Sequence, residues 1–187
     1  GFVPSEGAAV FVIEDLDSAA RRGASVLAEV RGYGCTNDAY HLVAPDPKGI
    51  GAAESIRLAL ADAGLAPGDI DYVSAHGTGT VRGDAAETAA LHLALDGRAG
   101  KVSVSAAKSM LGHSMGASGA LEVAACLQTF KTGIIHPTIN LDDPDPLCDL
   151  DYVPGEARPA NVRVILKPSF AFGGHNATLV LTSPETL

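Results

Sequence analysis

The chain has 187 residues, 47% of them hydrophobic and 5% aromatic, so it carries enough apolar material to bury one sizeable core in a single domain. Its 13 Lys and Arg against 22 Asp and Glu give a formal net charge of −9, and the basic residues are scattered, which argues against nucleic-acid binding. No apolar run reaches the roughly 20 residues of a membrane helix, and no charged leader precedes an apolar signal core. The sequence therefore predicts a soluble, cytoplasmic protein that binds neither nucleic acid nor membranes.

The three cysteines, Cys35, Cys126 and Cys148, lie far apart in the chain and lack CxxC spacing. This pattern argues against both a disulfide framework and a zinc site. The histidines also lack the HExxH or i, i+4 spacing of a zinc helix, so no metal site is predicted. Because the chain opens with Gly1 and not Met, we expect it to be part of something longer.

The first third of the chain alternates predicted strands and helices. A short apolar run at residues 8–14 predicts a buried strand, and the Ala/Arg segment after it predicts a short helix that ends at Gly23. Residues 26–33 predict a second strand, and the polar, proline-containing residues 36–49 predict a long loop. Apolar residues at three- and four-residue spacing then predict an amphipathic helix over residues 51–63.

Two strand, loop and helix units follow in tandem. The strand at residues 70–75 leads through a polar loop into a helix at 84–95, and the strand at 102–105 leads through another into a helix at 117–130. Each of the two loops contains a histidine. Loops at the carboxyl ends of parallel strands gather at one sheet edge, where ligands bind, so we expect the two histidines to meet there.

The last part of the chain is expected to close the sheet. Residues 136–160 are rich in proline and acidic residues and predict a segment that wraps the surface. Two strands are predicted at 162–168 and 177–182, with a glycine-rich turn over residues 169–176 between them. Together with the Ala-rich composition, these elements predict an α/β fold.

The first candidate motif is the run His76, Gly77, Thr78, Gly79 and Thr80. A histidine at a strand end can present its imidazole to a pocket, the glycines let a substrate approach the backbone, and the hydroxyls can bind amide or phosphate oxygens. The alternative is a tight strand-to-helix turn with a satisfied histidine. The run is not a phosphate-binding P-loop, because the required lysine is missing.

The second candidate motif consists of Lys108 and His113, followed by Glu122. A lysine five residues before a histidine can hold a charge network, and the glutamate can orient one of its members. The alternative is a solvated lysine beside a helix-capping loop.

A third motif, G-x-S-x-G at residues 112–116, matches the nucleophile elbow of α/β hydrolases and makes a serine hydrolase using Ser114 a further alternative. An elbow serine should follow its strand at once, yet Ser114 lies nine residues beyond Ser105, which counts against this function. The later residues that could complete a triad in the permitted order are Asp142, Asp143, Asp145 and His175.

In order and spacing, three loops resemble the carboxyl-terminal half of a β-ketoacyl-acyl carrier protein synthase, a ketosynthase of the type II elongating kind. The matching loops are residues 76–80, residues 108–113 with Gly116, Gly119 and Glu122, and residues 170–176; the stretches 38–41, 137–141 and 148–154 are also similar. The resemblance implies a thiolase-like half with a mixed five-stranded sheet flanked by helices. It also implies that residues 1–187 form one domain, the second half of the fold, without the amino-terminal half that bears the nucleophilic cysteine.

The activity that the resemblance implies is decarboxylative condensation of malonyl carrier protein with an acyl thioester, in fatty acid or polyketide biosynthesis. Two histidines of the family, matched here by His76 and His113, stabilise negative charge on the thioester oxygen. Lys108 and Glu122 match charged residues that support the second histidine. Phe172 matches a gate over the acyl pocket, whose backbone N–H helps to stabilise the tetrahedral oxyanion.

The substrate side of the site follows from the same resemblance. Thr78 and Thr80 match the pair that contacts the phosphopantetheine arm, and Phe170, Gly173 and Gly174 belong to the expected substrate-binding loop. No cofactor is implied, because phosphopantetheine arrives on the carrier protein. The implied partners are the amino-terminal half, the acyl carrier protein and a second subunit in a homodimer or heterodimer.

Two positions depart from the family pattern, since Ala171 replaces a glycine and His175 replaces a threonine. None of the three cysteines suits the nucleophile's place, so the chain is expected to form a complete acyltransferase only with a cysteine-bearing half. A non-catalytic ketosynthase-like partner that shapes an acyl tunnel is the alternative. The basic residues that could dock a carrier protein are Arg21, Arg22, Arg57, Lys101 and Lys131.

Overall fold

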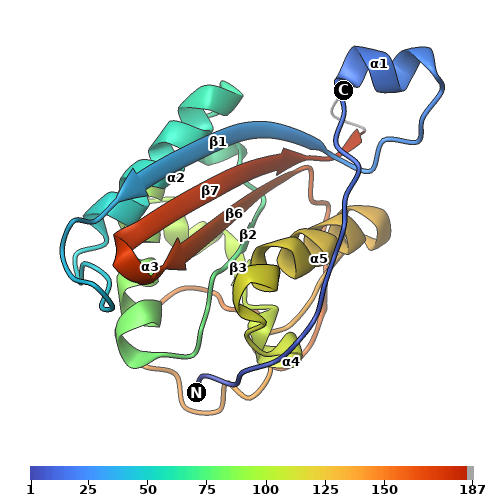
Figure 1. Ribbon diagram of the computed structural model, residues 1–187. Helices are drawn as coiled ribbons and strands as arrows, with labels where there is room; N and C mark the ends of the chain where they lie inside the picture. Colours follow the sequence, from blue (N-terminus) through green and yellow to red (C-terminus); the bar gives the residue numbers. More distant parts are fainter. Residues whose placement is uncertain (185–187) are drawn as a thin grey trace.

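One mixed sheet of five strands organises the chain, and the computed structural model describes residues 1–184 (Figure 1). The strand order is β1-β7-β6-β2-β3. β1 (Glu29–Asn37), β7 (His175–Thr182) and β6 (Val164–Ala171) pair antiparallel, whereas β2 (Tyr72–Ser74) pairs parallel with both β6 and β3 (Ser103–Ser105). The structure confirms the predicted α/β fold with a mixed five-stranded sheet, while the last three residues of the predicted domain 1–187 lie outside the described residues.

The two tandem units predicted from the sequence are present. β2 leads into α3 (Val81–Leu95), whose amino terminus is capped by the Thr80 hydroxyl, which accepts from Gly83 N at 3.2 Å. β3 leads through the short α4 (Lys108–Leu111) into α5 (Ser118–Thr132). Because β2 and β3 run parallel, both histidine-bearing loops leave the sheet at the same edge.

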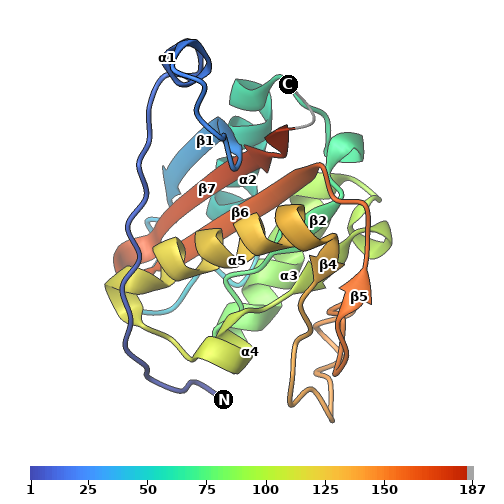
Figure 2. The ribbon, with the colours of Figure 1, turned by 90° about the vertical axis from the view of Figure 1, so that its right-hand side faces the viewer.

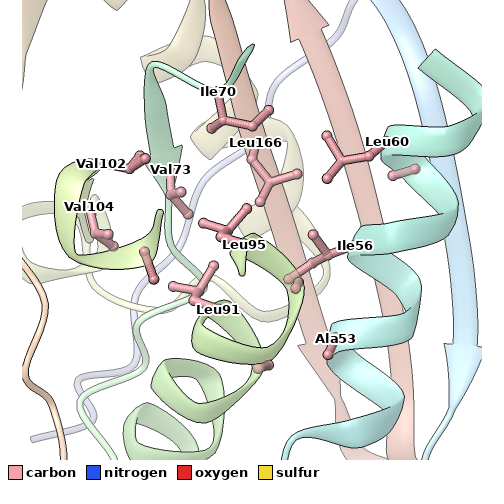
Figure 3. Close-up of a cluster of buried hydrophobic side chains, with 14 of the residues drawn as sticks. Ala53, Ile56, Leu60, Ile70, Val73, Leu91, Leu95, Val102, Val104 and Leu166 are labelled. Atoms are coloured by element: carbon pink, nitrogen blue, oxygen red, sulfur yellow. The ribbon is translucent and has the colours of Figure 1, made fainter. Parts of the chain in front are cut away.

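Helices cover both faces of the sheet (Figure 2). α2 (Ile50–Ala63) and α3 pack on one face and α5 on the other. Successive residues of β6 point to opposite faces of the sheet. Leu166 packs in the core under α2 and α3, and Ile165 packs in the core under α5. Figure 3 shows Ile56 and Leu91 meeting Leu166 in the larger cluster.

Two glycines let α2 approach the edge strand β1 closely. A Cβ atom at Gly32 would lie 2.2 Å from the Ala59 carbonyl oxygen, and one at Gly34 would lie 2.0 Å from the Ser55 carbonyl oxygen. These positions therefore exclude side chains. β1 covers Glu29–Asn37 and not the predicted residues 26–33, because its pairing with β7 runs from Glu29 to Asn37, and the predicted loop begins at residue 38.

The prediction of a buried strand at residues 8–14 is wrong. This segment is extended but pairs with no strand among residues 1–184, and Val10, Val12 and Ile13 are 92%, 88% and 79% exposed. The apolar run indicates burial, but burial requires a neighbouring sheet that these residues do not reach. The short helix after it is confirmed as α1 (Leu16–Arg21), with the Asp15 carboxylate accepting from Ser18 N at 3.1 Å.

The final third of the chain adds elements that the sequence pattern missed. β4 (Ile134–Ile135) and β5 (Arg158–Pro159) form a two-stranded ladder at either end of the acidic segment. β6 and β7 extend further into the glycine-rich turn than predicted, so a single 3₁₀ turn joins them at Phe172–Gly174. The other 3₁₀ turns lie at Pro67–Asp69, Ala99–Lys101 and Met115–Ala117. No helix within residues 1–184 is long and apolar enough to cross a membrane.

Candidate active site

The two loop histidines meet at the carboxyl edge of β2 and β3, as predicted. The ring centroids of His76 and His113 lie 5.8 Å apart, with the rings almost perpendicular at 88°. His76 follows β2 after one buried residue, and Gly77, with a φ of +43°, turns the chain away from the sheet. The parallel strand pair thus brings together residues that are 37 positions apart in the sequence.

The amino-terminal residues of the chain hold His113 in place. Its backbone N–H donates to the Val3 carbonyl at 2.7 Å, and its carbonyl accepts from Ser5 N at 3.0 Å. The ring of Phe2 lies 5.0 Å from the imidazole, between centroids. The amino terminus runs beside α4 in Figure 1, an arrangement that residue spacing alone did not predict.

Glu87 of α3 holds the backbone at His76, and the sequence analysis missed it. Its carboxylate accepts from His76 N at 2.7 Å and from Gly77 N at 2.8 Å, and the residue is 5% exposed. Burial raises the pKa of Glu87 to about 6, although the two N–H donors oppose the shift. A signal was available, because Glu87 lies four residues before Leu91 on the apolar face of the helix.

Lys108 and Glu122 form a buried ion pair, 7% and 1% exposed, and the lysine contacts His76. The Lys108 ammonium donates to the His76 carbonyl oxygen at 2.5 Å and to His76 Nδ1 at 3.3 Å. The resemblance placed this pair behind the second histidine. The hydrogen bonds join the pair to His76, and the charges of both residues also act on His113.

Hydrogen bonds fix the tautomer of both histidines. An ammonium has no lone pair, so Lys108 donates to His76 Nδ1, which leaves the ring proton on Nε2. The backbone N–H of Met115 likewise donates to His113 Nδ1 at 3.0 Å. Each neutral ring therefore carries its N–H donor on Nε2.

The surroundings also keep both rings neutral. Burial lowers the pKa of His76 to about 2, with further lowering by the positive charges of Lys108 and Lys167. Burial, followed by the charge of Lys108, lowers the pKa of His113. Neutral N–H donors of this kind can stabilise negative charge that develops on an oxygen.

The threonines of the first motif line a cavity of about 600 Å³ next to the histidines. Thr78 Oγ1 and Thr80 Oγ1 lie 2.9 Å apart. Lys108 and His113 also line this cavity, whereas His76 adjoins it through its neighbour Gly77. The hydroxyl pair and His113 therefore border one ligand-sized space.

The β6–β7 hairpin places Phe170 and Phe172 differently. The Phe170 ring lies 5.6 Å from that of His76, whereas Phe172 is 75% exposed at the turn. Gly173 and Gly174 both have positive φ, and the Gly173 N–H donates to the Leu42 carbonyl at 2.8 Å. Of the aromatic residues in this hairpin, Phe170 therefore packs against His76, whereas Phe172 lies at the exposed turn.

The two departures from the family pattern lie in the same hairpin. Ala171 has a φ of −141° and a ψ of 163°, which is ordinary extended backbone. An alanine is therefore unstrained there and stiffens the approach to the turn. His175 begins β7 and is exposed.

The geometry does not favour Ser114 as a nucleophile. It precedes a 3₁₀ turn and not a strand-to-helix elbow, and its hydroxyl lies 3.3 Å from that of Ser118. Among residues 1–184, no hydrogen bond joins Ser114 to a histidine, and it is Ser118 Oγ that lies 3.0 Å from His113 Nδ1. Ser118 is thus a second site residue that the sequence analysis missed.

The cysteines do not join the site. Cys35 is exposed on β1, and Cys126 lies on the buried face of α5, where burial raises the pKa of its thiol to about 11. Cys148 lines the cavity wall, and burial raises the pKa of its thiol as well. The described part of the chain contains no group of three or more metal-ligating side chains.

One further buried charge belongs to the site. Lys167 of β6 is 2% exposed, and its ammonium lies 2.7 Å from Glu122 Oε2. The sequence analysis missed this residue, although a single lysine within the otherwise apolar stretch of residues 164–168 is a signal of a buried charge.

Paired neutral imidazoles beside a buried ammonium suit the stabilisation of an oxyanion in an α/β protein. Comparison with known families makes the assignment specific. Residues 27–142 match "Beta-ketoacyl synthase, C-terminal domain", and the chain belongs to the β-ketoacyl synthase family.

Individual relatives agree with this assignment. The chain is 49% identical over 179 residues to 3-oxoacyl-[acyl-carrier-protein] synthase 2 of Synechocystis sp., covering 96% of this chain and 43% of that protein. It is similar to the solved ishigamide ketosynthase/chain length factor, with a TM-score of 0.91 and 47% identity over 98% of this chain and 44% of that one. A type II PKS acyl-carrier protein in complex with its ketosynthase bound to the hexaketide gives a TM-score of 0.89 and 36% identity, over 91% and 42% of the two chains.

These comparisons confirm the predicted family and its thiolase-like fold. The chain spans less than half the length of the relatives that it matches.

Proposed function

We propose that this chain is the histidine-bearing half of a β-ketoacyl synthase, which condenses malonyl carrier protein with an acyl thioester in fatty acid or polyketide biosynthesis. The observation that carries the proposal is the pair His76 and His113, 5.8 Å apart and each with its ring proton on Nε2. Relatives named as 3-oxoacyl-carrier-protein synthase and as polyketide ketosynthase support both settings. The nucleophilic cysteine is assigned to an amino-terminal half.

The chemistry begins with the loss of carbon dioxide from the malonyl thioester. The breaking C–C bond leaves its electron pair on an enolate whose negative charge resides on the thioester oxygen, where the Nε2–H groups of His76 and His113 donate. The enolate carbon then attacks the acyl thioester on the cysteine, and the tetrahedral oxyanion collapses to expel the thiolate. The backbone N–H of Phe172 is the proposed donor to that second oxyanion.

Substrate reaches these groups on the arm of a carrier protein, so no separate cofactor is needed. Thr78 and Thr80, with hydroxyls 2.9 Å apart on the cavity wall, are the proposed contacts for the phosphopantetheine arm. A carrier protein bound to a ketosynthase in one related structure supports this partner.

The amino-terminal half is the second partner in the proposal. The exposed apolar residues Val10, Val12 and Ile13 offer a surface that such a half would cover. The complete enzyme is proposed to be a cytoplasmic homodimer or heterodimer.

The test uses the assembled enzyme, in which this chain is combined with a cysteine-bearing half. His76→Ala and His113→Ala are each expected to lower the rate of carbon dioxide release from malonyl carrier protein by roughly 100-fold or more. His92→Ala is the matched control, because His92 is exposed on α3 and its only hydrogen-bond partner among the described side chains is Asp149, at 2.6 Å. Unchanged decarboxylation in both site variants would refute the proposal.

A second candidate function is that of a non-catalytic partner that sets chain length. The similarity to a structure that includes a chain length factor supports this candidate. Such a partner does not need two histidines with fixed tautomers. A wild-type assembly that binds carrier protein but releases no carbon dioxide would select this function.

A further inference from the structure

Lys167 is a buried lysine for which the proposed reaction gives no role. It is 2% exposed at the centre of β6, although a lysine is almost never buried without a partner. Its neighbour two residues earlier, Ile165, packs under α5, and the alternation along the strand directs Lys167 to the same face. That face carries Glu122 of α5.

The ammonium of Lys167 donates two hydrogen bonds and forms an ion pair with a third oxygen. It lies 2.7 Å from Glu122 Oε2 and 2.9 Å from Ser169 Oγ, and it also donates to the Pro168 carbonyl. Two of these partners belong to the segment that leads into Phe170, the residue whose ring contacts His76. The lysine therefore joins the start of the hairpin to α5.

Two lysines divide the carboxylate of Glu122 between them. Lys108 pairs with Oε1 and Lys167 lies against Oε2, and all three residues are less than 9% exposed. With Lys108 alone, one buried carboxylate oxygen would have no partner, and the group could rotate about its terminal bond. Glu122 Oε2 has no hydrogen-bond partner among the described residues, so the ion pair with Lys167 is the contact that holds this side of the carboxylate, and with it the Lys108 ammonium against His76.

We propose that Lys167 is a positioning residue of the site, which holds Glu122 so that Lys108 stays bonded to Nδ1 and the carbonyl of His76. This inference rests on the proposed function, since it assigns the lysine a part in the decarboxylation step. A chain of contacts then runs from Lys167 through Glu122 and Lys108 to His76, and Lys167 is its member farthest from the histidine.

The experiment is a double-mutant cycle in the assembled enzyme, with kcat and KM measured for decarboxylation of malonyl carrier protein. Lys167→Met, which keeps the length of the side chain without its charge, is expected to lower kcat roughly tenfold while KM stays within twofold. If Lys167 acts through Glu122, the double variant with Glu122→Gln is no slower than Glu122→Gln alone. Lys167→Gln, which keeps a donor for Oε2, is expected to fall between Lys167→Met and the wild type.

Thr129→Val is the matched control for removing a buried polar group on α5, because within residues 1–184 the Thr129 hydroxyl donates only to the Ala125 carbonyl of its own helix, at 3.3 Å. Rates are normalised to the folded fraction from thermal unfolding, and Lys167→Gln replaces Lys167→Met in the cycle if the latter does not fold. A kcat within twofold of wild type, or losses that multiply in the double variant, overturns the assignment of Lys167 while leaving the proposed function intact. A wild-type assembly that releases no carbon dioxide overturns both.

Discussion

Replacement of Lys108 by methionine should lower the free energy of unfolding, because Lys108 belongs to the buried cluster of charges that it forms with Glu122 and Lys167. The substitution removes an ion pair with Glu122 and the hydrogen bonds to the carbonyl and Nδ1 of His76. Removing one partner of a buried pair costs about 3 to 5 kcal/mol when the other charge is left alone. Here Lys167 still faces Glu122, so the expected loss lies at the lower end, about 3 kcal/mol.

For a chain of this size, about 3 kcal/mol corresponds to a fall in Tm of roughly 6 to 12 °C. Urea unfolding followed by circular dichroism measures the free energy directly, and the m-value should stay constant. Lys131→Met is the control, since Lys131 is an exposed lysine in the last turn of α5, and its loss should change stability by less than about 0.5 kcal/mol. A loss below about 1 kcal/mol for Lys108→Met would refute the assigned contacts.

Three further outcomes are expected. Gly34→Val should destabilise the fold by about 2 kcal/mol or more in urea unfolding, because its Cβ would lie 2.0 Å from the Ser55 carbonyl. Thr78→Val with Thr80→Val should raise KM for malonyl carrier protein several-fold while kcat stays within twofold. Since burial raises the Glu87 pKa to about 6, this group contributes about 2 kcal/mol of stability that is complete below pH 4.5 and lost as the pH rises through 6; Glu87→Gln should flatten that slope in pH-dependent unfolding.

The elements that the sequence predicted well are those whose pattern is local. The spacing of apolar residues in α2 places the helix at Ile50–Ala63, against a predicted 51–63, and Gly64 ends it in the left-handed conformation. The two histidine loops were also predictable, since consecutive parallel units bring their loops to one edge.

What the sequence did not predict depends on contacts between distant segments. Residues 8–14 have the composition of a buried strand, but burial depends on whether another sheet is within reach. Glu87 and Lys167 stand at core-facing positions of apolar elements, but their positions in the sequence do not show which groups their charges contact. Only the packing of α3 and β6 against the histidine loops and α5 shows why each is buried.

Both site histidines are assigned here as neutral Nε2–H donors, and histidine ¹⁵N NMR of the assembled enzyme at pH 7 detects the protonation of each ring nitrogen. His76→Gln and His113→Gln variants assign the two rings. The structure predicts an unprotonated Nδ1 and a protonated Nε2 for each, because Lys108 and Met115 donate to the Nδ1 atoms. A doubly protonated ring, or a proton on Nδ1 of either histidine, would show that these tautomers are wrong.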